Sequence, residues 1–168
     1  ANCPGVWVML VSGRALDELR RLVSLPNLCY VGNHGLELRD PQVRYVNPAA
    51  QAARPILRQL AQELTQALRA VRGAWVENKG LTLSVHYRDV PLDGTVRVKN
   101  VFYAVLQPYQ ARRQVRVTTG HCVFEVRPPV RWTKATMVSW LLARRAAANG
   151  SRVLPVYIGD DLTDEDVF

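Results

Sequence analysis

The stretch VLPVYIGDDLTDEDVF, residues Val153–Phe168, decides the fold, because an apolar run leads directly into a dense cluster of acids. The run from Val153 to Ile158 has the pattern of a strand buried in a sheet, and Gly159 and Asp160 follow it at once. Five of the 14 acidic residues fall in the last nine positions, whereas basic residues outnumber acids 22 to 9 in the rest of the chain. Clustered carboxylates repel one another unless a cation neutralises them, and hard divalent metals bind oxygen ligands of this kind.

Two interpretations of this acidic cluster are open. One is a magnesium site at the end of the strand. The other is the acidic first turn of a helix in which Thr163 is the N-cap, with Glu165 and Asp166 near the positive end of the helix dipole. The helix alone leaves the adjacent pair of Asp160 and Asp161 unexplained, so the pattern favours the magnesium site.

Length and composition predict a soluble cytoplasmic protein. The 168 residues fit one domain or two small ones that share a core. The three cysteines, Cys3, Cys29 and Cys122, are odd in number and lack the spacing of a metal site, which suggests reduced thiols. No apolar run approaches the length of a membrane span, and the first residues lack the profile of a signal peptide. We therefore expect no membrane partner.

The net charge of +8 raises the question of a nucleic-acid partner. The arginines are scattered singly or in pairs, and no basic stripe is interleaved with aromatic residues, so a nucleic-acid partner is disfavoured. Only three basic residues are lysines, namely Lys79, Lys99 and Lys134. A chain that uses arginine almost everywhere is expected to keep lysine mainly where a compact ammonium is required. Lys79 and Lys134 are therefore candidate functional residues.

The N-terminal region predicts a strand, a small polar turn and a helix. The apolar run Val6–Val11 fits a strand buried on both faces of a parallel sheet, and Ser12, Gly13 and Arg14 end it. Leucines at helical spacing follow. Ligands of open α/β sheets bind beyond the carboxyl ends of the strands, where Ser12 and Asp160 are both expected.

The rest of the chain predicts an α+β module between two α/β pieces. Stretches with helical spacing alternate with period-two stretches, so the middle region is expected to run helix, two strands, helix, two strands. The expected elements are short strands within 28–38, helices near 56–68, 98–105 and 133–148, and strands at 75–79, 81–87, 115–118 and 122–127. The predicted boundaries are 1–36 for the first core part, 37–124 for the inserted module and 125–168 for the second core part.

Five motifs are spread along the chain, namely Ser12-Gly13-Arg14, Gly32-Asn33-His34-Gly35-Leu36-Glu37, Glu77-Asn78-Lys79-Gly80 continuing through His86-Tyr87-Arg88, Glu125-Val126-Arg127-Pro128, and Tyr157 to Phe168. Together they resemble one enzyme family, the trehalose-6-phosphate phosphatases, which are haloacid dehalogenase-like phosphatases. The resemblance covers essentially the whole chain, and the ending and the Glu77–Arg88 block are its most specific parts. It implies a haloacid dehalogenase-like Rossmannoid α/β core with an inserted α+β cap.

The resemblance implies hydrolysis of trehalose 6-phosphate to trehalose and phosphate through a phospho-aspartate. One carboxylate attacks phosphorus, a second protonates the leaving sugar hydroxyl, and Mg²⁺ neutralises charge. By resemblance to the family, Asp160 is a magnesium ligand and Asp164 supports the groups that coordinate the metal. Ser12 donates its hydroxyl to a phosphoryl oxygen, and the Lys134 ammonium stabilises the phosphoryl group and orients the nucleophile. Taken alone, Ser12 also fits a helix N-cap and Lys134 a solvated lysine in a first helical turn.

The resemblance also implies a set of substrate-binding residues, which comprises Arg14, Glu77, Lys79, Arg88 and Glu125. Glu77 and Lys79 lie two residues apart on one predicted strand and therefore point to the same face, as binding of sugar hydroxyls requires. A cross-strand ion pair on a solvated sheet face is the alternative explanation for these charges.

Two departures from the family pattern stand out. The family places an Asp-x-Asp-Gly-Thr motif before Ser-Gly-Arg, and the 168 residues do not contain it, so we expect a fragment that is inactive alone. The strand that carries this motif lies between the strands leading to Ser12 and Asp160 in the superfamily, so those two strands are expected to present unpaired edges. Thr133 and Ala135 stand where the family usually has Asp and Gly beside the lysine.

Two rival functions remain compatible with these motifs. One is a phosphatase with the same cap that acts on another sugar phosphate such as sucrose phosphate, which the Glu77–Arg88 block disfavours. The other is a catalytically inactive sugar-phosphate-binding regulatory domain attached to a trehalose-phosphate synthase. A fused or associated synthase is thus a possible partner besides the small-molecule substrate.

Overall fold

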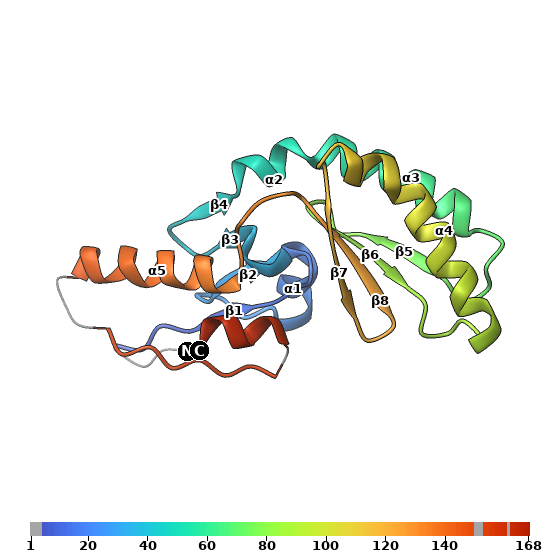
Figure 1. Cartoon of the computed structure of the whole chain (residues 1–168). Helices are drawn as coiled ribbons and strands as arrows, with labels where there is room; N and C mark the ends of the chain where they lie inside the picture. Colours follow the sequence, from blue (N-terminus) through green and yellow to red (C-terminus); the bar gives the residue numbers. More distant parts are fainter. Residues whose placement is uncertain (1–4, 150–152, 161) are drawn as a thin grey trace. The chain divides into compact units, whose positions relative to one another are not determined.

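The computed structural model describes residues 5–149, 153–160 and 162–168, which form two compact units (Figure 1). Unit 1 consists of Ala1–Val46 together with Arg131–Phe168, and unit 2 consists of Asn47–Val130. The chain therefore leaves unit 1 after Val46 and returns after Val130, whereas the sequence pattern places these boundaries after Leu36 and Phe124. The difference arises because residues 37–46 pair with the sheet of unit 1, and residues 125–127 pair with the sheet of unit 2.

Unit 1 is built on a four-stranded sheet with the order β1-β2-β3-β4. β1 and β2 run parallel, with Leu10 opposite Tyr30, and the other neighbours run antiparallel. The strands are β1 (Met9–Val11), β2 (Cys29–Gly32), β3 (Glu37–Arg39) and β4 (Arg44–Val46). The predicted strand Val6–Val11 is thus shortened to its last three residues, and Val6 is exposed.

Helices cover both faces of this sheet. Cys29 and Val31 pack with Met137 and Leu141 of α5 (Lys134–Asn149), whereas Leu28 and Tyr30 pack with Leu16 and Leu19 of α1 (Leu16–Val23). Alternate residues of a strand point to opposite faces, so α1 and α5 lie on opposite sides of β2. This arrangement confirms the predicted helices and explains why the strand at β2 reads as a continuous apolar run.

The predicted strand Val153–Ile158 is wrong for this structure. These residues are extended chain outside any described sheet, and Leu154, Val156 and Ile158 are 87%, 81% and 91% exposed. An apolar segment forms a strand only when a neighbouring strand pairs with its backbone N–H and C=O groups. None of β1–β4 pairs with residues 153–158. A short 3-10 helix, η2 (Leu162–Val167), follows where the alternative interpretation placed an α-helix capped by Thr163.

Unit 2 contains the predicted order of helix, two strands, helix, two strands, preceded by one short extra helix. Its sheet has the order β5-β6-β8-β7 and is antiparallel throughout. The elements are α2 (Pro48–Ala52), α3 (Arg54–Leu68), β5 (Trp75–Asn78), β6 (Leu83–His86), α4 (Leu92–Ala111), β7 (Arg116–Gly120) and β8 (Val123–Arg127). α4 runs past Pro108, which loses only one hydrogen-bond donor in the last turn of the helix.

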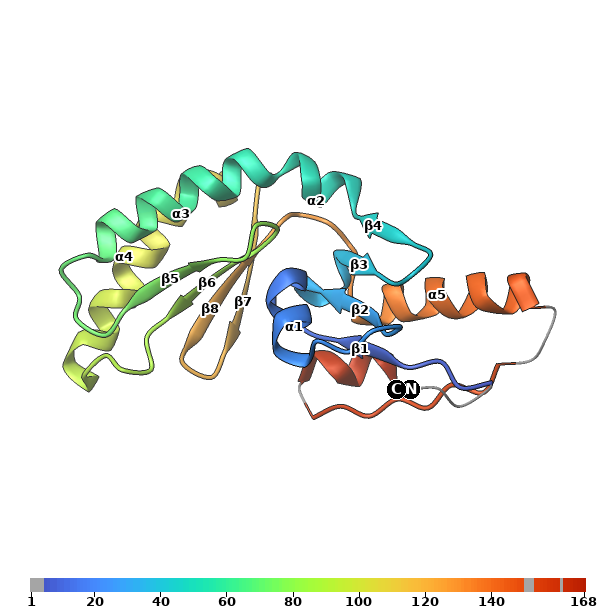
Figure 2. The same cartoon turned by 180° about the vertical axis from the view of Figure 1, so that it is seen from behind.

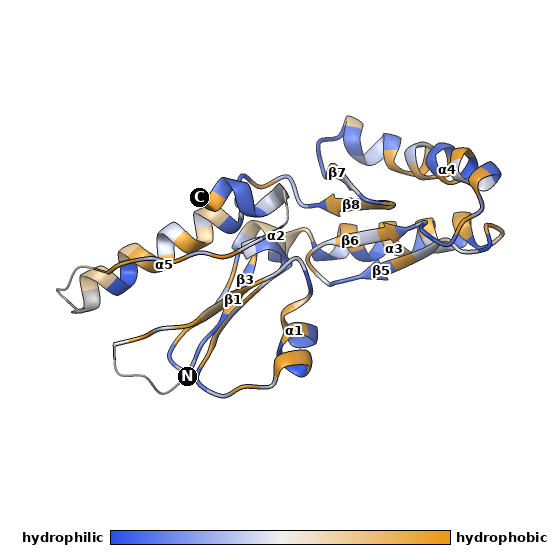
Figure 3. Ribbon diagram, turned by 90° about the horizontal axis from the view of Figure 1, so that it is seen from below, coloured by the Kyte–Doolittle hydropathy of each residue, from blue (hydrophilic) through white to orange (hydrophobic). Residues whose placement is uncertain are grey.

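The core of unit 2 lies between the sheet and the pair α3 and α4. Leu57, Leu60 and Leu64 of α3, Val98, Phe102 and Leu106 of α4, and Leu83 and Val85 of β6 are fully buried, and Phe102 stacks on Phe124 with ring centroids 4.3 Å apart. Figure 2 shows α3 and α4 on the same side of this sheet, and Figure 3 shows hydrophobic and hydrophilic residues alternating along α4. The other face of the sheet carries polar side chains.

None of the helices within residues 5–149 and 162–167 combines the length and apolar character needed to cross a membrane.

The stacking of Phe102 on Phe124 predicts a large loss of stability on truncation. We expect Phe102→Ala to lower the free energy of unfolding by about 3–5 kcal/mol, because it removes a fully buried ring and leaves a cavity. Leu92→Ala on the same helix is the control, since Leu92 is 93% exposed, and should change stability by less than about 0.5 kcal/mol. Urea unfolding followed by circular dichroism measures both changes, and equal effects would contradict this packing.

The environment of Cys29 predicts an inert thiol. Burial, reinforced by the negative charge of Asp40, raises the pKa of Cys29 to about 12, so the residue remains protonated and unreactive at pH 8.5. Iodoacetamide at that pH should modify Cys122, which is partly exposed, and leave Cys29 unmodified until urea is added. Peptide mapping by mass spectrometry distinguishes the two sites. Rapid native modification of Cys29 would show that β2 is accessible.

Candidate functional site

The turn Ser12–Arg14 at the end of β1 is bonded to the 3-10 helix η1 (Asn33–Gly35). The backbone N–H of His34 donates to Ser12 O at 3.0 Å, and that of Asn33 donates to Arg14 O at 2.7 Å. The Ser12 backbone N–H donates to Val31 O at 2.9 Å. Ser12 Oγ accepts from the Arg14 N–H at 3.2 Å, a bond that leaves the hydroxyl proton able to be donated elsewhere. The backbone around the predicted phosphate-binding serine is therefore fixed by η1.

Close packing of His34 explains the glycine of the Ser-Gly-Arg motif. A Cβ atom on Gly13 would lie 2.5 Å from Cε1 and Nε2 of the buried His34 ring, so any larger residue would displace that ring. Asn33 and His34 have positive φ values of 48° and 56°, a conformation that costs energy for residues other than glycine. The hydrogen bonds to the turn offset this cost. Arg14, predicted to bind substrate, is exposed and forms an ion pair with Glu18.

Glu37 joins this turn to the start of α1. Its Oε1 atom accepts from the backbone N–H of Leu16 at 2.8 Å and from Nδ2 of Asn33 at 2.6 Å. The carboxylate therefore caps the helix from 21 residues further along the chain, where the helix dipole favours a negative charge. The sequence identified Glu37 only as part of a motif and gave it no role, because nothing local links it to Leu16.

Lys134 is the first residue of α5, and its ammonium binds the carboxylate of Asp164. Nζ lies 2.7 Å from Oδ1, and the two side chains are 5% and 8% exposed. The hydroxyl of Tyr157 donates to the same oxygen at 2.6 Å. Gly159 packs tightly here, because a Cβ atom at that position would lie 2.6 Å from Asp164 Cβ. The structure thus joins Lys134 and Asp164 in one buried cluster, whose member Tyr157 the sequence did not identify as a site residue.

The same η1 segment also contacts the start of α5. Trp132 Nε1 donates to Gly35 O at 2.8 Å, and a Cβ atom on Gly35 would meet Thr133 O at 2.7 Å. Gly35, with φ at 97°, therefore allows α5 to approach. The turn that contains Ser12 and the residue preceding Lys134 consequently both lie against η1, within unit 1.

The residues expected to bind magnesium are of the right chemical type. Asp160 is exposed and follows Gly159, which touches Asp164, and both aspartates offer the oxygen ligands that Mg²⁺ prefers. Oδ1 of Asp164 is engaged by an ammonium and a hydroxyl in this structure. Within residues 5–149, 153–160 and 162–168, no group of three or more His, Cys, Asp and Glu side chains is arranged to hold a metal ion. Asp161 lies outside the described residues.

Unit 2 carries a second polar cluster on the sheet face that α3 and α4 do not cover. Glu77, Ser84, Glu125 and Thr118 stand opposite one another across the four strands. The Lys79 ammonium, on a side chain that is 8% exposed, lies 3.9 Å from Glu77 Oε2 and 3.6 Å from Glu125 Oε1. The predicted residues Glu77, Lys79 and Glu125 therefore lie together, with the ammonium between two carboxylates.

Two further residues, which were not predicted as site residues from the sequence, belong to this cluster. His86 Nε2 donates to Glu77 Oε2 at 2.9 Å, and the Arg127 guanidinium donates to Glu125 Oε2 at 2.5 Å. Each carboxylate thus contacts Lys79 on one side and a second nitrogen group on the other. The available signal was the period of two, since Arg127 follows Glu125 by two residues. Arg88, also predicted here, is exposed in the turn after β6, and the described contacts do not join it to the cluster.

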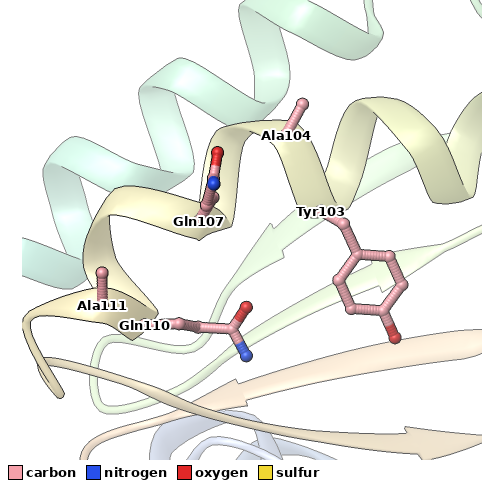
Figure 4. Close-up of a pocket in the computed structure, with 5 residues that line it drawn as sticks. All are labelled: Tyr103, Ala104, Gln107, Gln110 and Ala111. Atoms are coloured by element: carbon pink, nitrogen blue, oxygen red, sulfur yellow. The ribbon is translucent and has the colours of Figure 1, made fainter.

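Two surface hollows of unit 2 lie along its helices, away from this polar face. One is lined by residues of α4, where Tyr103 and Gln110 project from the same side of the helix (Figure 4); the full set is Tyr103, Ala104, Gln107, Gln110 and Ala111. The other lies between α3 and α4, beside Glu63 and Pro108. Neither contains a predicted site residue.

A family model and a relative of known sequence both match the whole length of this chain. A family model described as Trehalose-phosphatase matches residues 1–168. The trehalose-phosphate phosphatase of Mycobacterium tuberculosis is 41% identical over 169 residues, which include 100% of this chain and 41% of the mycobacterial protein. The chain therefore spans less than half the length of this relative.

Solved structures share the mixed α/β fold. The C-terminal domain of Candida albicans trehalose-6-phosphate phosphatase matches with a TM-score of 0.76 and 25% identity, over 98% of this chain and 60% of that domain. The C-terminal domain of the C. albicans trehalose synthase regulatory protein matches with a TM-score of 0.65 and 10% identity, over 89% of this chain and 51% of that domain. The second likeness concerns the fold alone.

The two hydrogen bonds to Glu37 predict a specific loss on substitution. Glu37→Ala should lower the free energy of unfolding by about 1–3 kcal/mol, because the Leu16 N–H and the Asn33 amide lose their acceptor. Glu37→Gln keeps an acceptor oxygen and should lose less. Hydrogen exchange at the Leu16 amide, measured by NMR, should accelerate in the alanine variant. An unchanged rate would show that Glu37 does not cap α1.

Proposed function

This chain belongs to the trehalose-phosphatase family, and we propose on that basis that it is part of a phosphatase acting on trehalose 6-phosphate. Unit 1 corresponds to a haloacid dehalogenase-like core that binds phosphate and magnesium, and unit 2 to an α+β cap that selects the sugar. The nucleophilic aspartate is supplied by a longer polypeptide, in agreement with the 41% of the mycobacterial relative that this chain spans. The free thiols of Cys29 and Cys122 support a cytoplasmic location.

The observation that carries this proposal is the buried pair of Lys134 and Asp164. An ammonium that is 5% exposed and faces a carboxylate is held in one position, as stabilisation of a phosphoryl group requires. Asp164 holds the ammonium in place and compensates its charge, since an uncompensated buried charge would be strongly unfavourable. Ser12, whose backbone is fixed by η1, donates its hydroxyl to a phosphoryl oxygen. Both groups act as positioned donors.

Magnesium fits the oxygen donors of Asp160 and Asp164, and when bound it supplies positive charge that stabilises the phosphoryl oxygens. In the reaction the aspartate of the longer polypeptide attacks phosphorus, the bond to the sugar oxygen breaks, and a second carboxylic acid protonates that oxygen. Water then hydrolyses the phospho-aspartate. In this scheme the chain's own residues bind and orient the phosphoryl group.

The polar cluster of unit 2 supports a sugar as the substrate. Carboxylates accept hydrogen bonds from sugar hydroxyls, and an ammonium donates to their oxygens, so Glu77, Lys79 and Glu125 offer both kinds of contact on one face. Arg14 and Arg88, both exposed, are further proposed substrate contacts. A cluster of this kind distinguishes a polyhydroxylated substrate from a generic phosphate ester.

A catalytically inactive regulatory domain attached to a trehalose-phosphate synthase is the second candidate. It is compatible with the fold, which this chain shares with the C-terminal domain of the C. albicans regulatory protein. Such a domain would bind sugar phosphate without releasing inorganic phosphate. A fused or associated synthase is a proposed partner in either case.

Phosphate release from trehalose 6-phosphate tests the proposal. We expect the polypeptide encoded by the whole gene to release phosphate in the presence of Mg²⁺, and the 168-residue chain alone to release none. Chelation with EDTA should abolish the activity, and excess Mg²⁺ should restore it. Binding of trehalose 6-phosphate by the whole polypeptide without turnover would favour the regulatory alternative.

Lys134→Ala in that polypeptide should lower kcat by about 100-fold to 1000-fold, because it removes a preorganised cation from the phosphoryl group. Lys99→Ala is the matched control, since Lys99 is an exposed lysine on α4, and should leave kcat unchanged. Circular dichroism spectra of both variants establish that they are folded. Equal activity of the two variants would remove Lys134 from the catalytic site.

A further inference from the structure

Trp75 extends the polar cluster of unit 2 along the open face of the sheet. It precedes Glu77 by two residues on β5, so both side chains point to the same face. Its neighbour Val76 packs against the core on the other face. The indole is 50% exposed and lies beside the partly buried charges of this cluster.

The orientation of this indole is fixed by His86. The two residues stand opposite each other on β5 and β6, and their rings stack with centroids 4.0 Å apart and planes 15° apart. His86 in turn donates to Glu77 Oε2 at 2.9 Å. The stacked rings and the charged cluster are therefore one connected surface, and the indole is held flat against the imidazole instead of rotating freely in solvent.

The chemistry of this surface matches an uncharged sugar. Glu77 and Glu125 contribute two negative charges, and Lys79 and Arg127 contribute two positive charges, so these four ion-paired groups sum to zero. A pyranose ring has an apolar face of C–H groups, which packs on an aromatic ring, and a rim of hydroxyls, which bind carboxylates and ammonium groups. Two residues along a strand span about 7 Å, comparable to one sugar ring.

The side chain of Ser84 adds a further polar group. Ser84 lies between Glu77 and Glu125 across the sheet, is 1% exposed, and its Oγ has no hydrogen-bond partner in the described structure. Buried hydroxyls usually have a partner, so the floor of this face retains unused hydrogen-bonding capacity. A bound sugar or a water beneath it would satisfy this group.

We propose that Trp75 and His86 form a stacking platform for a pyranose ring, beside the cluster of Glu77, Lys79 and Glu125. This inference rests on the proposed function and deepens it, because it assigns the unphosphorylated sugar ring of the substrate to this platform. Trp75 acts by burying the apolar face of the ring, and His86 holds both the indole and the Glu77 carboxylate in position. The phosphate group does not contribute to binding here.

Binding of trehalose to the 168-residue chain tests the platform directly. Isothermal titration calorimetry should show that Trp75→Ala weakens the affinity for trehalose by about tenfold, corresponding to roughly 1.4 kcal/mol, and that Trp75→Phe weakens it less because a ring remains. Tyr103→Ala is the matched control, since Tyr103 is a 45% exposed aromatic residue on α4, over the opposite face of the sheet. It should bind trehalose as the wild type does.

Tryptophan fluorescence gives a readout that a merely structural role would not change. Trehalose should shift the emission of the wild-type chain to shorter wavelength, and the shift should vanish in Trp75→Phe while that variant still binds. The inference is overturned if the wild-type chain does not bind trehalose, if Trp75→Ala binds it unchanged, or if Trp75→Phe retains the shift.

Kinetics of the whole polypeptide separate this inference from the proposed function. Trp75→Ala should raise the KM for trehalose 6-phosphate about tenfold and leave inhibition by inorganic phosphate unchanged. If the wild-type polypeptide releases no phosphate but the chain binds trehalose through Trp75, the proposed function fails and the platform stands. If turnover is normal and KM does not depend on Trp75, the platform fails alone.

Discussion

The hydrogen bonds between η1 and the turn Ser12–Arg14 are the constraint on which unit 1 depends. They fix the backbone of the turn, and the Glu37 carboxylate extends the same network to the first amide of α1. Trp132 attaches the start of α5 to the other side of η1. The short helix η1 therefore positions two helices and a turn. Its residues Asn33 and His34 keep a strained left-handed conformation because hydrogen bonds fix the segment to its neighbours.

The ion pair between Lys134 and Asp164 differs in burial from the charged cluster of unit 2. Both of its side chains are nearly fully buried, so removal of either partner would leave an uncompensated charge in a region of low dielectric. In unit 2 the carboxylates of Glu77 and Glu125 are partly exposed, and their contacts with Lys79 are longer. Solvent screens these charges, which suits a surface that exchanges its internal contacts for those of a ligand.

The two faces of the sheet of unit 2 differ in character. One face is covered by α3 and α4 and contains the apolar core, whereas the other carries the polar cluster and Trp75. A residue shift of one position along any strand would exchange the two faces, so the apolar packing of Val85 and Phe124 fixes the register that places Ser84 opposite Glu125. Rigid strands thereby position the polar groups more accurately than a loop would.

Elements with local patterns could be predicted from the amino-acid sequence. Helical spacing identified α1, α3, α4 and α5, the period of two identified the two strand pairs of unit 2, and the spacing of Glu77 and Lys79 placed them on one face. Contacts between distant residues could not be predicted in this way, such as the cap that Glu37 provides for α1 and the bond of Tyr157 to Asp164. The same holds for the finding that Val153–Ile158 is not a strand and that Arg44–Val46 is one. The physical reason is that a strand depends on its neighbour for hydrogen bonds, and an apolar pattern does not say whether that neighbour is present.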